Sequence, residues 1–345
     1  PSTRRPRPLP FQKGMGLAHE GYAGIDGYGS HASFAAMGRL KTMGADWVAL
    51  SPFGFMRDPR GEEVSFLRGE AQNVGAENDT AVLATIEAAH RLGLRVMLKP
   101  QLWLHDGHWT GDISMRTEES WRGFFLQYRE FLMHYALLAA AGRADLLVVG
   151  VEMQSASRRE KDWRALIALT RAMYDGPLTY SANWGEEFER IGFWDALDFA
   201  GLDCYYPLDA DPEAGDDALS AGARSIAQRV ERVARSAGRQ IILTEVGFPA
   251  LASAWVAPHD DRTGRAADPE AQARGYRAIL AAFWDRPWLA GLFWWKWPTT
   301  PEAGGRDPLF SPRGRPAERV LSDWYTRARR VVGDWPVAVE NGLVQ

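Results

Sequence analysis

Strand-like and helix-like segments alternate along the 345 residues of this chain, which predicts an α/β fold in the form of a single-domain (β/α)8 TIM barrel. Eight short apolar runs, several of them rich in β-branched residues, have the length of strands buried on both faces. Amphipathic segments separate most of them, so we expect a parallel sheet with right-handed crossovers. Eight such repeats in a chain of this length match a closed barrel.

The predicted strands are Gly14–Ala18, Asp46–Ser51, Arg95–Gln101, Leu146–Glu152, Leu178–Ser181, Phe199–Cys204, Gln240–Glu245 and Ala290–Trp297. The predicted helices are His31–Met43, Asp79–Leu92, Glu118–Ala141, Asp162–Tyr174, Ser220–Ser236 and Pro269–Trp284. Asn78 or Asp79 can cap the second helix, Gly93 can end it, and Asp268 can cap the last one. A doubly wound open sheet is the competing architecture, but Gly14-Met15-Gly16 is only part of the glycine motif expected after its first strand.

The ends of the chain are expected to lie outside the barrel. Residues 1–10, rich in proline and arginine, predict a flexible linker, residues 11–332 the barrel, and residues 333–345 a C-terminal tail. The chain begins with Pro1 instead of methionine, which suggests that an upstream segment, such as a secretory signal, was removed. We therefore expect a secreted or periplasmic protein, with a cytoplasmic one as the alternative.

Composition argues against several classes of function. A formal net charge of −4 gives no reason to expect a nucleic-acid partner. Cys204 is the only cysteine of the sequence, which excludes an internal disulfide and a cysteine-based metal cluster. No apolar run has the length of a membrane span. The 15 tryptophans fit a carbohydrate groove, because flat rings suit the apolar faces of sugars, although core packing explains most tryptophans in any protein.

Two glutamates stand at the downstream ends of predicted strands. Glu152 closes the fourth strand and Glu245 the seventh, so a barrel would place both at its carboxyl rim, where enzymes of this fold carry their chemistry. A retaining glycoside hydrolase needs such a pair about 5–5.5 Å apart, one as acid and one as nucleophile. Burial and a neighbouring negative charge would raise the pKa of the acid. The alternative is that each glutamate forms a salt bridge with a loop arginine.

The nucleophile must stay ionised, which calls for hydrogen-bond donors near it. Tyr205 and Tyr206 follow the predicted sixth strand and are candidates. Lys99 lies in an apolar strand, where an unpaired charge is costly. It either donates to sugar hydroxyls or neutralises a carboxylate of the barrel, and we favour a role in the site. Asp203 and Cys204, within the sixth strand, are expected to be structural.

A set of segments carries a family resemblance. They are Leu98-Lys99-Pro100 with Trp103, Trp109 and Gly111, residues 178–186 (LTYSANWGE), 193–208 (FWDALDFAGLDCYYPL), 244–249 (TEVGFP), 272–274 (QAR), 293–297 (FWWKW) and 310–317 (FSPRGRPA). In this order they resemble glycoside hydrolase family 113, a family of β-mannanases in the retaining, eight-stranded clan A. The similarity runs from about Gly14 to Tyr325, nearly the whole chain.

The resemblance implies that Glu152 is the acid/base and Glu245 the nucleophile, in agreement with their places at strand ends. One position departs from the pattern. Many clan A enzymes carry asparagine just before the acid/base, where it binds the sugar 2-hydroxyl, but this chain has Val151. Asn183 is a candidate substitute. Because mannose differs from glucose at that hydroxyl, the departure bears on substrate choice.

Tryptophans near strand ends are candidates for sugar binding. We predict that Trp297 forms the floor under the sugar being cleaved, with Trp294 as the second choice; the alternative for either is packing against the outer helices. On a regular strand the two cannot both point inward. Trp103 and Trp109 either line further sugar subsites or hold their loop in place. Trp184, at the tip of the fifth strand, is a similar candidate.

Histidines and acids in two loops raise the question of a metal: His19, Glu20, His105, Asp106 and His108. The histidines lack the helical spacing of a zinc motif. We therefore expect neither a metal nor a cofactor, and interpret these residues as solvated loop residues or sugar contacts.

The sequence as a whole predicts a retaining glycoside hydrolase that acts on β-1,4-linked mannan or manno-oligosaccharides. The expected partner is an oligo- or polysaccharide, with no nucleic acid and no membrane span, and a monomer is favoured. Alternatives among enzymes are a hydrolase or transglycosylase on glucan, galactan or xylan, and a metal-dependent barrel hydrolase. From another class, the alternative is a non-catalytic glycan-binding barrel.

Overall fold

Eight parallel strands close into a barrel in the part of the chain that the computed structural model describes, residues 9–19, 26–69, 77–261, 264–300, 309–331, 333 and 335. Around the barrel their order is β1-β11-β10-β9-β8-β7-β5-β2. They are β1 (Gln12–Ala18), β2 (Trp47–Leu50), β5 (Arg95–Leu98), β7 (Leu146–Val151), β8 (Leu178–Asn183), β9 (Ala200–Asp203), β10 (Ile241–Val246) and β11 (Leu289–Pro298). Each overlaps one predicted strand, so the predicted (β/α)8 barrel is confirmed.

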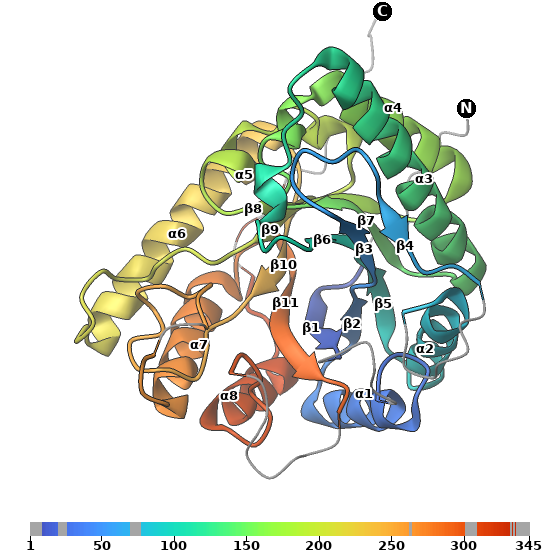
Figure 1. Cartoon of the computed structure of the whole chain (residues 1–345). Helices are drawn as coiled ribbons and strands as arrows, with labels where there is room; N and C mark the ends of the chain where they lie inside the picture. The colour runs from blue at the N-terminus through green and yellow to red at the C-terminus, as the bar shows by residue number, and fades with distance from the viewer. Residues whose placement is uncertain are drawn as a thin grey trace, which may run out of the picture.

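Helices surround the strands on the outside (Figure 1). They are α1 (His31–Met43), α2 (Asp79–Arg91), α3 (Glu118–Gly142), α4 (Glu160–Met173), α5 (Glu186–Arg190), α6 (Asp216–Ala237), α7 (Pro269–Phe283) and α8 (Pro316–Thr326), with short 3-10 helices η1 (Thr110–Asp112), η2 (Ala156–Arg158) and η3 (Trp194–Ala196). The six predicted helices are present with small shifts of their ends, whereas α5 and α8 are additional. The side chains of Asn78 and Asp268 cap α2 and α7, and Gly93 has a φ of +68°.

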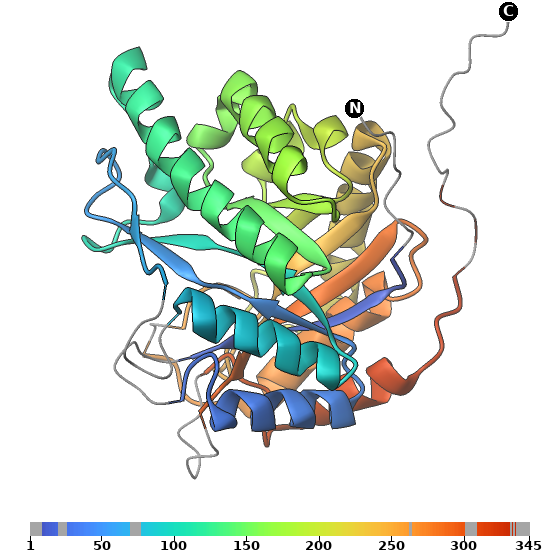
Figure 2. The ribbon, with the colours of Figure 1, turned by 90° about the vertical axis from the view of Figure 1, so that its right-hand side faces the viewer.

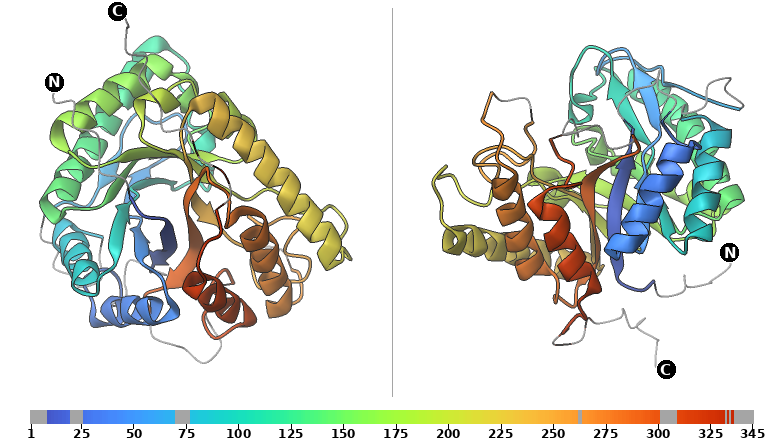
Figure 3. Two further views of the ribbon diagram at one scale, coloured as in Figure 1. Left: turned by 180° about the vertical axis from the view of Figure 1, so that it is seen from behind. Right: turned by 90° about the horizontal axis from the view of Figure 1, so that it is seen from below.

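The first and last parts of the chain meet where the barrel closes. β1 pairs with β11, and α1 lies beside α8 (Figure 3, right). Arg39 of α1 forms a salt bridge with Glu318 of α8 at 3.1 Å. The hydroxyl of Tyr325 donates to the carbonyl of Gly14 over 2.7 Å. These contacts hold α8 against the first strand and complete the outer ring.

The two sides of the barrel strands bury different side chains. Along β2, Trp47 and Ala49 belong to a small apolar cluster, while Val48 and Leu50 join the larger core between strands and helices. The small cluster fills the barrel and comprises Trp47, Ala49, Met97, Leu146, Val148, Val151, Ile242, Ala290 and Phe293. Since side chains alternate along a strand, Lys99 follows Met97 on the inner side, at the carboxyl rim.

A second, three-stranded sheet stands at the carboxyl end of the barrel and was not predicted. Its strands are β3 (Phe53–Met56), β4 (Ser65–Phe66) and β6 (Gln101–Leu104), in the order β4-β3-β6. β3 follows β2 directly and β6 follows β5, so two barrel strands extend into this small sheet. Figure 2 shows the hairpin of β3 and β4 standing out from one end of the barrel.

β11 departs from regular alternation near its carboxyl end. Trp294 pairs with Met15 of β1 and Trp297 pairs with Leu17, so three steps along β11 oppose two along β1. This bulge shifts the alternation by one residue, and both Trp294 and Trp297 therefore face the outer helices, fully buried. Trp295 lies on the inner side, and the Trp295–Lys296 peptide bond is cis.

The predicted linker and tail fall largely outside the described residues, which include neither residues 1–8 nor most of 333–345. The predicted domain bounds therefore stay a prediction. Across the described ranges, no helix combines the length and apolar character needed to cross a membrane.

Candidate active site

The carboxyl end of the barrel contains an open cavity of about 600 Å³. Its walls come from the ends of β7 to β11 and from the segments that follow β2 and β5. Its lining includes Glu152, Glu245, Asp203, Tyr205, Gln101, Val151, Asn183, Trp103, Trp109, Trp184, Trp295, Phe53, His259 and Phe310. The two glutamates that stand out in the sequence thus line one cavity, together with four tryptophans.

Glu245 lies near the end of β10 and is surrounded by hydrogen-bond donors. The Lys99 ammonium is 2.5 Å from its Oε1, and the side-chain amide of Gln101 donates to the same oxygen over 3.3 Å. The Tyr205 hydroxyl donates to Oε2 over 2.9 Å. Three donors, one of them a cation, therefore point at a single carboxylate, and charge-assisted bonds of this kind are the strong ones. Tyr205 makes the contact that its sequence position suggests.

A buried ion pair lies beneath Glu245. The Lys99 ammonium is 3.2 Å from both carboxylate oxygens of Asp203, and the hydroxyls of Ser181 and Thr244 donate to Asp203 over 2.6 and 2.8 Å. Burial by itself lowers the pKa of Lys99, but the charges of Asp203 and Glu245 outweigh it and raise that pKa above its ordinary value. Burial raises the pKa of Asp203 to about 6, against the charge of Lys99. These contacts fit the second role predicted for Lys99, neutralising a barrel carboxylate.

The side chain of Glu152 has a different environment. Its Oε2 accepts a hydrogen bond from the indole N–H of Trp109 over 2.8 Å. Burial, and then the charges of Asp203 and Glu245, raise the pKa of Glu152 well above its ordinary value, although the Trp109 bond and the charge of Lys99 act in the opposite direction. The carboxyl group is therefore held toward its protonated form, as a general acid requires.

The backbone at Glu152 is strained and supported from behind. Its φ of +51° lies in the left-handed region, which is uncommon for residues with a side chain and recurs at functional sites. The N–H of Glu152 donates to the carbonyl of Ser181 over 2.8 Å. The next N–H, of Met153, donates to the Tyr180 hydroxyl over 2.9 Å, and this hydroxyl donates to Glu187 over 2.7 Å. These bonds fix the turn that aims Glu152 into the cavity.

The structure corrects the prediction of Trp297 and Trp294 as the sugar floor. Both side chains have no exposed surface, and neither lines the active-site cavity. The Trp294 ring stacks on Tyr276 of α7 with centroids 3.8 Å apart, and the guanidinium of Arg39 lies 5.5 Å from the Trp297 ring. Trp295 faces the cavity instead. Ordinary alternation after the inward-facing Phe293 turns Trp294 outward and Trp295 inward, and the bulge in β11 then turns Trp297 outward as well.

Tyr206 is also placed differently from the prediction. It is buried, does not line the cavity, and accepts a hydrogen bond from the N–H of Gly185 over 2.8 Å. Its ring lies 5.3 Å from that of Trp184. Tyr206 therefore supports the loop that carries Trp184, while Trp184 and Asn183 line the cavity as the sequence suggests. Trp103 lines it too and is 56% exposed.

Sequence reasoning missed three residues of this site. Glu187 sits in a short acidic helix, where nothing in the residue pattern distinguishes it from its solvated neighbours. It is nonetheless buried, and this burial raises its pKa to about 7. Gln101 gave no signal as the last residue of a predicted strand. Trp295 lies in the run FWWKW, where the sequence analysis chose Trp294 and Trp297 as the sugar-binding residues.

The histidines considered as metal ligands each have a different partner. His19 is 2.7 Å from Glu77, His108 is 3.0 Å from Asp106, and the ring of His105 stacks on another aromatic ring. Glu20 lies outside the described residues. Within the described ranges, no group of three or more histidine, cysteine or acidic side chains is arranged to hold a metal ion.

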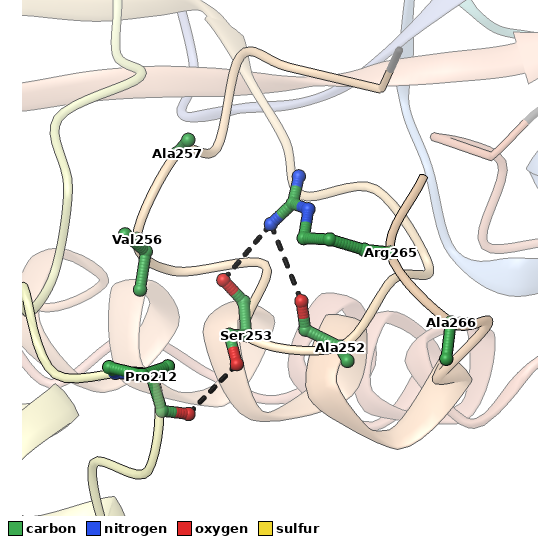
Figure 4. A pocket seen from close by; sticks show the side chains of 7 residues that line it. All are labelled: Pro212, Ala252, Ser253, Val256, Ala257, Arg265 and Ala266. Carbon is green, nitrogen blue, oxygen red and sulfur yellow. Dashed lines mark hydrogen bonds between the residues drawn. The ribbon is translucent and has the colours of Figure 1, made fainter. Parts of the chain in front are cut away.

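A second cavity, of about 510 Å³, lies in the loop between β10 and α7 (Figure 4). It is lined by Pro212, Ala252, Ser253, Val256, Ala257, Arg265 and Ala266. The guanidinium of Arg265 donates to the carbonyls of Ala252 and Ser253, so its charge is used to hold the loop. None of the seven lining residues is acidic, unlike the lining of the carboxyl-end cavity.

A glycoside hydrolase is the class of enzyme that this barrel and its paired glutamates define. Comparison with known proteins gives the same answer, because the family Glycoside Hydrolase Family 113 matches residues 21–305. The chain belongs to this family, and the resemblance seen in its sequence is confirmed. A search of curated protein sequences found no match.

Solved structures of this family are similar over almost the whole chain. The GH113 β-mannanase AaManA from Alicyclobacillus acidocaldarius, in complex with ManMIm, is 31% identical, with a TM-score of 0.81, covering 92% of this chain and 97% of that one. Two structures of a GH113 β-1,4-mannanase are 25% identical, with TM-scores of 0.80 and 0.81, covering 92% and 100% of the respective chains. A Faecalibacterium prausnitzii β-glucuronidase, 14% identical with a TM-score of 0.60 over 91% of this chain and 48% of that one, shares the fold.

Proposed function

We propose that this enzyme hydrolyses β-1,4-linked mannan or manno-oligosaccharides with retention of anomeric configuration. Glu152 acts as general acid and then base, and Glu245 acts as nucleophile. The observation that carries the proposal is the contrast between two carboxyl groups in one cavity. Glu245 receives three hydrogen bonds, whereas the pKa of Glu152 is raised. A retaining hydrolase needs one carboxylate that is oriented for attack and one carboxyl group that can give up a proton.

In the first step, the carboxylate of Glu245 attacks the anomeric carbon while the protonated Glu152 gives its proton to the glycosidic oxygen. The bond between the anomeric carbon and that oxygen breaks, and a covalent ester joins the sugar to Glu245. In the second step, Glu152, now a carboxylate, takes a proton from water as the water attacks the anomeric carbon. The ester bond breaks, Glu245 is released as a carboxylate, and Glu152 is protonated again.

The surrounding groups suit these charge changes. Lys99, Gln101 and Tyr205 orient Glu245 before attack and receive its returning charge when the ester breaks. When Glu245 becomes a neutral ester, one of the charges that raise the pKa of Glu152 disappears. The pKa of Glu152 then falls, which suits its change from acid to base.

The choice of mannan rests on the relatives, whose solved structures are β-mannanases and β-1,4-mannanases. Two positions of this chain bear on the recognition of the sugar 2-hydroxyl. Val151 occupies the place before the acid/base and lines the cavity with an apolar side chain. Asn183 lines the same cavity and is the polar group proposed to contact that hydroxyl. Trp295 is proposed as the apolar surface under the ring.

The mechanism is tested by the configuration of the first product. Proton NMR recorded in the first minutes of hydrolysis of an aryl β-mannobioside is expected to show the β-anomer before mutarotation. An initial α-anomer would mean inversion and would overturn the assignment of Glu245 as nucleophile.

The substrate is tested with matched panels of manno-, gluco-, galacto- and xylo-oligosaccharides, followed by product analysis. We expect manno-oligosaccharides to be cleaved with the highest kcat/KM. Faster cleavage of another panel would reassign the sugar, products longer than the substrate would indicate transglycosylation, and binding without turnover would indicate a glycan-binding barrel.

A further inference from the structure

We propose that the cavity-facing side of the small sheet β3-β4-β6 is a platform for the glycone, the sugars that precede the bond to be cleaved. The inference depends on the proposed function, since it takes a β-linked glycan to occupy the cavity. It adds a second binding surface outside the barrel strands and says which end of the glycan, the glycone, lies on that surface.

The pairing of β3 with β6 determines which side chains share this side. Phe53 pairs with Gln101 and Phe55 pairs with Trp103, so these four side chains project from one side of the sheet. Phe53, Gln101 and Trp103 line the active-site cavity. Leu102 and Leu104 also border it, but both are buried, so the side that offers exposed surface to the cavity is that of Phe53, Gln101 and Trp103.

The opposite side of the sheet is closed by α3. A Cβ added to Gly54 would come within 2.7 Å of the Phe131 ring, so the backbone of β3 lies directly against this helix. Phe66 of β4 packs against the same ring with centroids 5.3 Å apart. One side of the sheet is therefore buried in the protein, and the other is available for a ligand.

The cavity-facing side carries aromatic rings with exposed surface. Trp103 is 56% exposed although it lies in the middle of a strand, and its ring meets that of Phe53 edge-on at 6.2 Å. Further along, the rings of Phe55 and His105 are stacked at 5.5 Å with an interplanar angle of 14°. Flat, partly exposed rings beside a polar amide suit a neutral sugar, which has an apolar face and a rim of hydroxyls.

The direction of the platform follows from where it begins. Gln101, its innermost residue, donates to Glu245, the proposed nucleophile, which bonds to the anomeric carbon of the glycone. The proposed acid Glu152, which would touch the leaving oxygen, contacts Trp109 beyond the end of β6 and not within the row from Gln101 to Trp103. Side chains on one side of a strand repeat every ~7 Å, close to the length of one sugar, so the row from Gln101 through Trp103 offers successive places for glycone sugars.

The test uses aryl β-mannosides with one, two or three sugars and the same aryl leaving group. In the parent enzyme, kcat/KM is expected to rise with each added sugar. In Trp103→Ala and Phe55→Ala the gain in kcat/KM from the added sugars should be about tenfold smaller. This is the effect expected when ~50 Å² of apolar sugar surface stays in water instead of covering an aromatic ring. Trp103→Phe should recover most of the rise. Leu137→Ala, which removes an apolar side chain 57% exposed on α3, is the matched control and should change nothing.

An unchanged rise in both alanine variants would overturn the platform. An equal loss on all three substrates would overturn it as well, because the effect would then come from damage to the cavity. If the parent cleaves none of these substrates, the proposed function fails instead of the platform.

Retardation of the proteins in gels containing galactomannan, β-glucan or xylan tests the platform independently of the proposed function, because it measures binding and needs no turnover. We expect at least one polysaccharide to retard the parent more than Trp103→Ala and Phe55→Ala. Equal mobility of the parent and both variants in every gel would end the proposal.

Discussion

Glu245 and Glu152 are the same type of residue in one cavity, but their hydrogen-bond donors, backbone conformations and neighbouring charges differ. Glu245 stands within a strand and receives bonds from an ammonium, an amide and a hydroxyl. Glu152 stands just beyond a strand with a φ of +51° and accepts one side-chain bond, from an indole. Burial and nearby carboxylates raise its pKa. The comparison shows that the fold gives two residues of one type different donors and charges, a difference that suits the proposed roles of nucleophile and acid.

The contacts that support Glu245 and those that support Glu152 also come from different parts of the fold. The Glu245 side rests on the buried pair of Lys99 and Asp203, which ties three barrel strands and their rim together. The Glu152 side depends on a loop residue, Trp109, in front and on the pair of Tyr180 in β8 and Glu187 in α5 behind. Changes on the first side should therefore affect stability as well as rate, and changes at Trp109 mainly the pH dependence.

The largest expected effect is that of Glu245→Ala. Loss of the nucleophile should lower kcat by about 10⁵–10⁶-fold, as at other enzyme nucleophiles. Added azide should attack an aryl β-mannoside from the vacated side and give the α-configured glycosyl azide, detected by NMR. Formation of a retained product with azide would contradict the assignment.

Glu152→Ala comes next and should depend on the leaving group. With natural oligosaccharides, kcat/KM is expected to fall by about 10²–10⁴-fold, the usual contribution of a general acid. A dinitrophenyl mannoside needs no proton to leave, so its first step, measured as the burst of dinitrophenol, should be largely spared. Equal losses on the two substrates would show that Glu152 is not the acid.

Lys99→Met should lower stability as well as rate, and the stability change is the more direct measure of the buried pair. The substitution leaves the buried Asp203 without its cation, and breaking a buried pair in this way costs about 3–5 kcal/mol. Chemical denaturation measures the change. The control is Arg91→Ala, whose exposed pair with Glu87 is worth less than about 1 kcal/mol. A loss no larger than that of the control would mean that Asp203 is neutral without Lys99.

Tyr205→Phe and Tyr206→Phe form a matched pair of neighbouring substitutions. Tyr205→Phe removes a donor to Glu245 and should lower kcat/KM by roughly 10–100-fold, the range for a hydrogen bond to a charged group. Tyr206→Phe removes the acceptor of the Gly185 N–H and should affect stability more than rate. Steady-state kinetics and thermal unfolding separate the two, and the reverse pattern would reassign the tyrosines.

Trp109→Phe should produce the smallest change, a shift in pH dependence. The indole bond stabilises ionised Glu152 and so lowers its pKa; without the bond, the pKa rises and the acid stays protonated to higher pH. The basic limb of the pH profile of kcat/KM should therefore move to higher pH. Trp103→Phe, which changes a neighbouring ring outside this bond, is the control. A limb that stays in place or moves down would contradict the proposed contact.

Much of the fold was accessible from the sequence because its signals are local. The run from Leu146 to Val151 is apolar and β-branched, and the segments beside it have helical periodicity, so strand and helix alternation could be counted directly. The same count put Glu152 and Glu245 at one rim, since parallel barrel strands end on the same side. The small sheet was missed because β3 and β4 are short and owe their pairing to α3 behind them.

The sequence by itself determined the barrel and the placing of Glu152 and Glu245 at one end of it, because these depend on periodicity and on the direction of parallel strands. The tertiary structure alone decided which tryptophan faces the cavity, that Tyr205 and not Tyr206 contacts Glu245, and that Glu187 is buried behind the site. A one-residue bulge in β11 and the packing of loops against each other set these outcomes, and neither leaves a periodic trace along the chain.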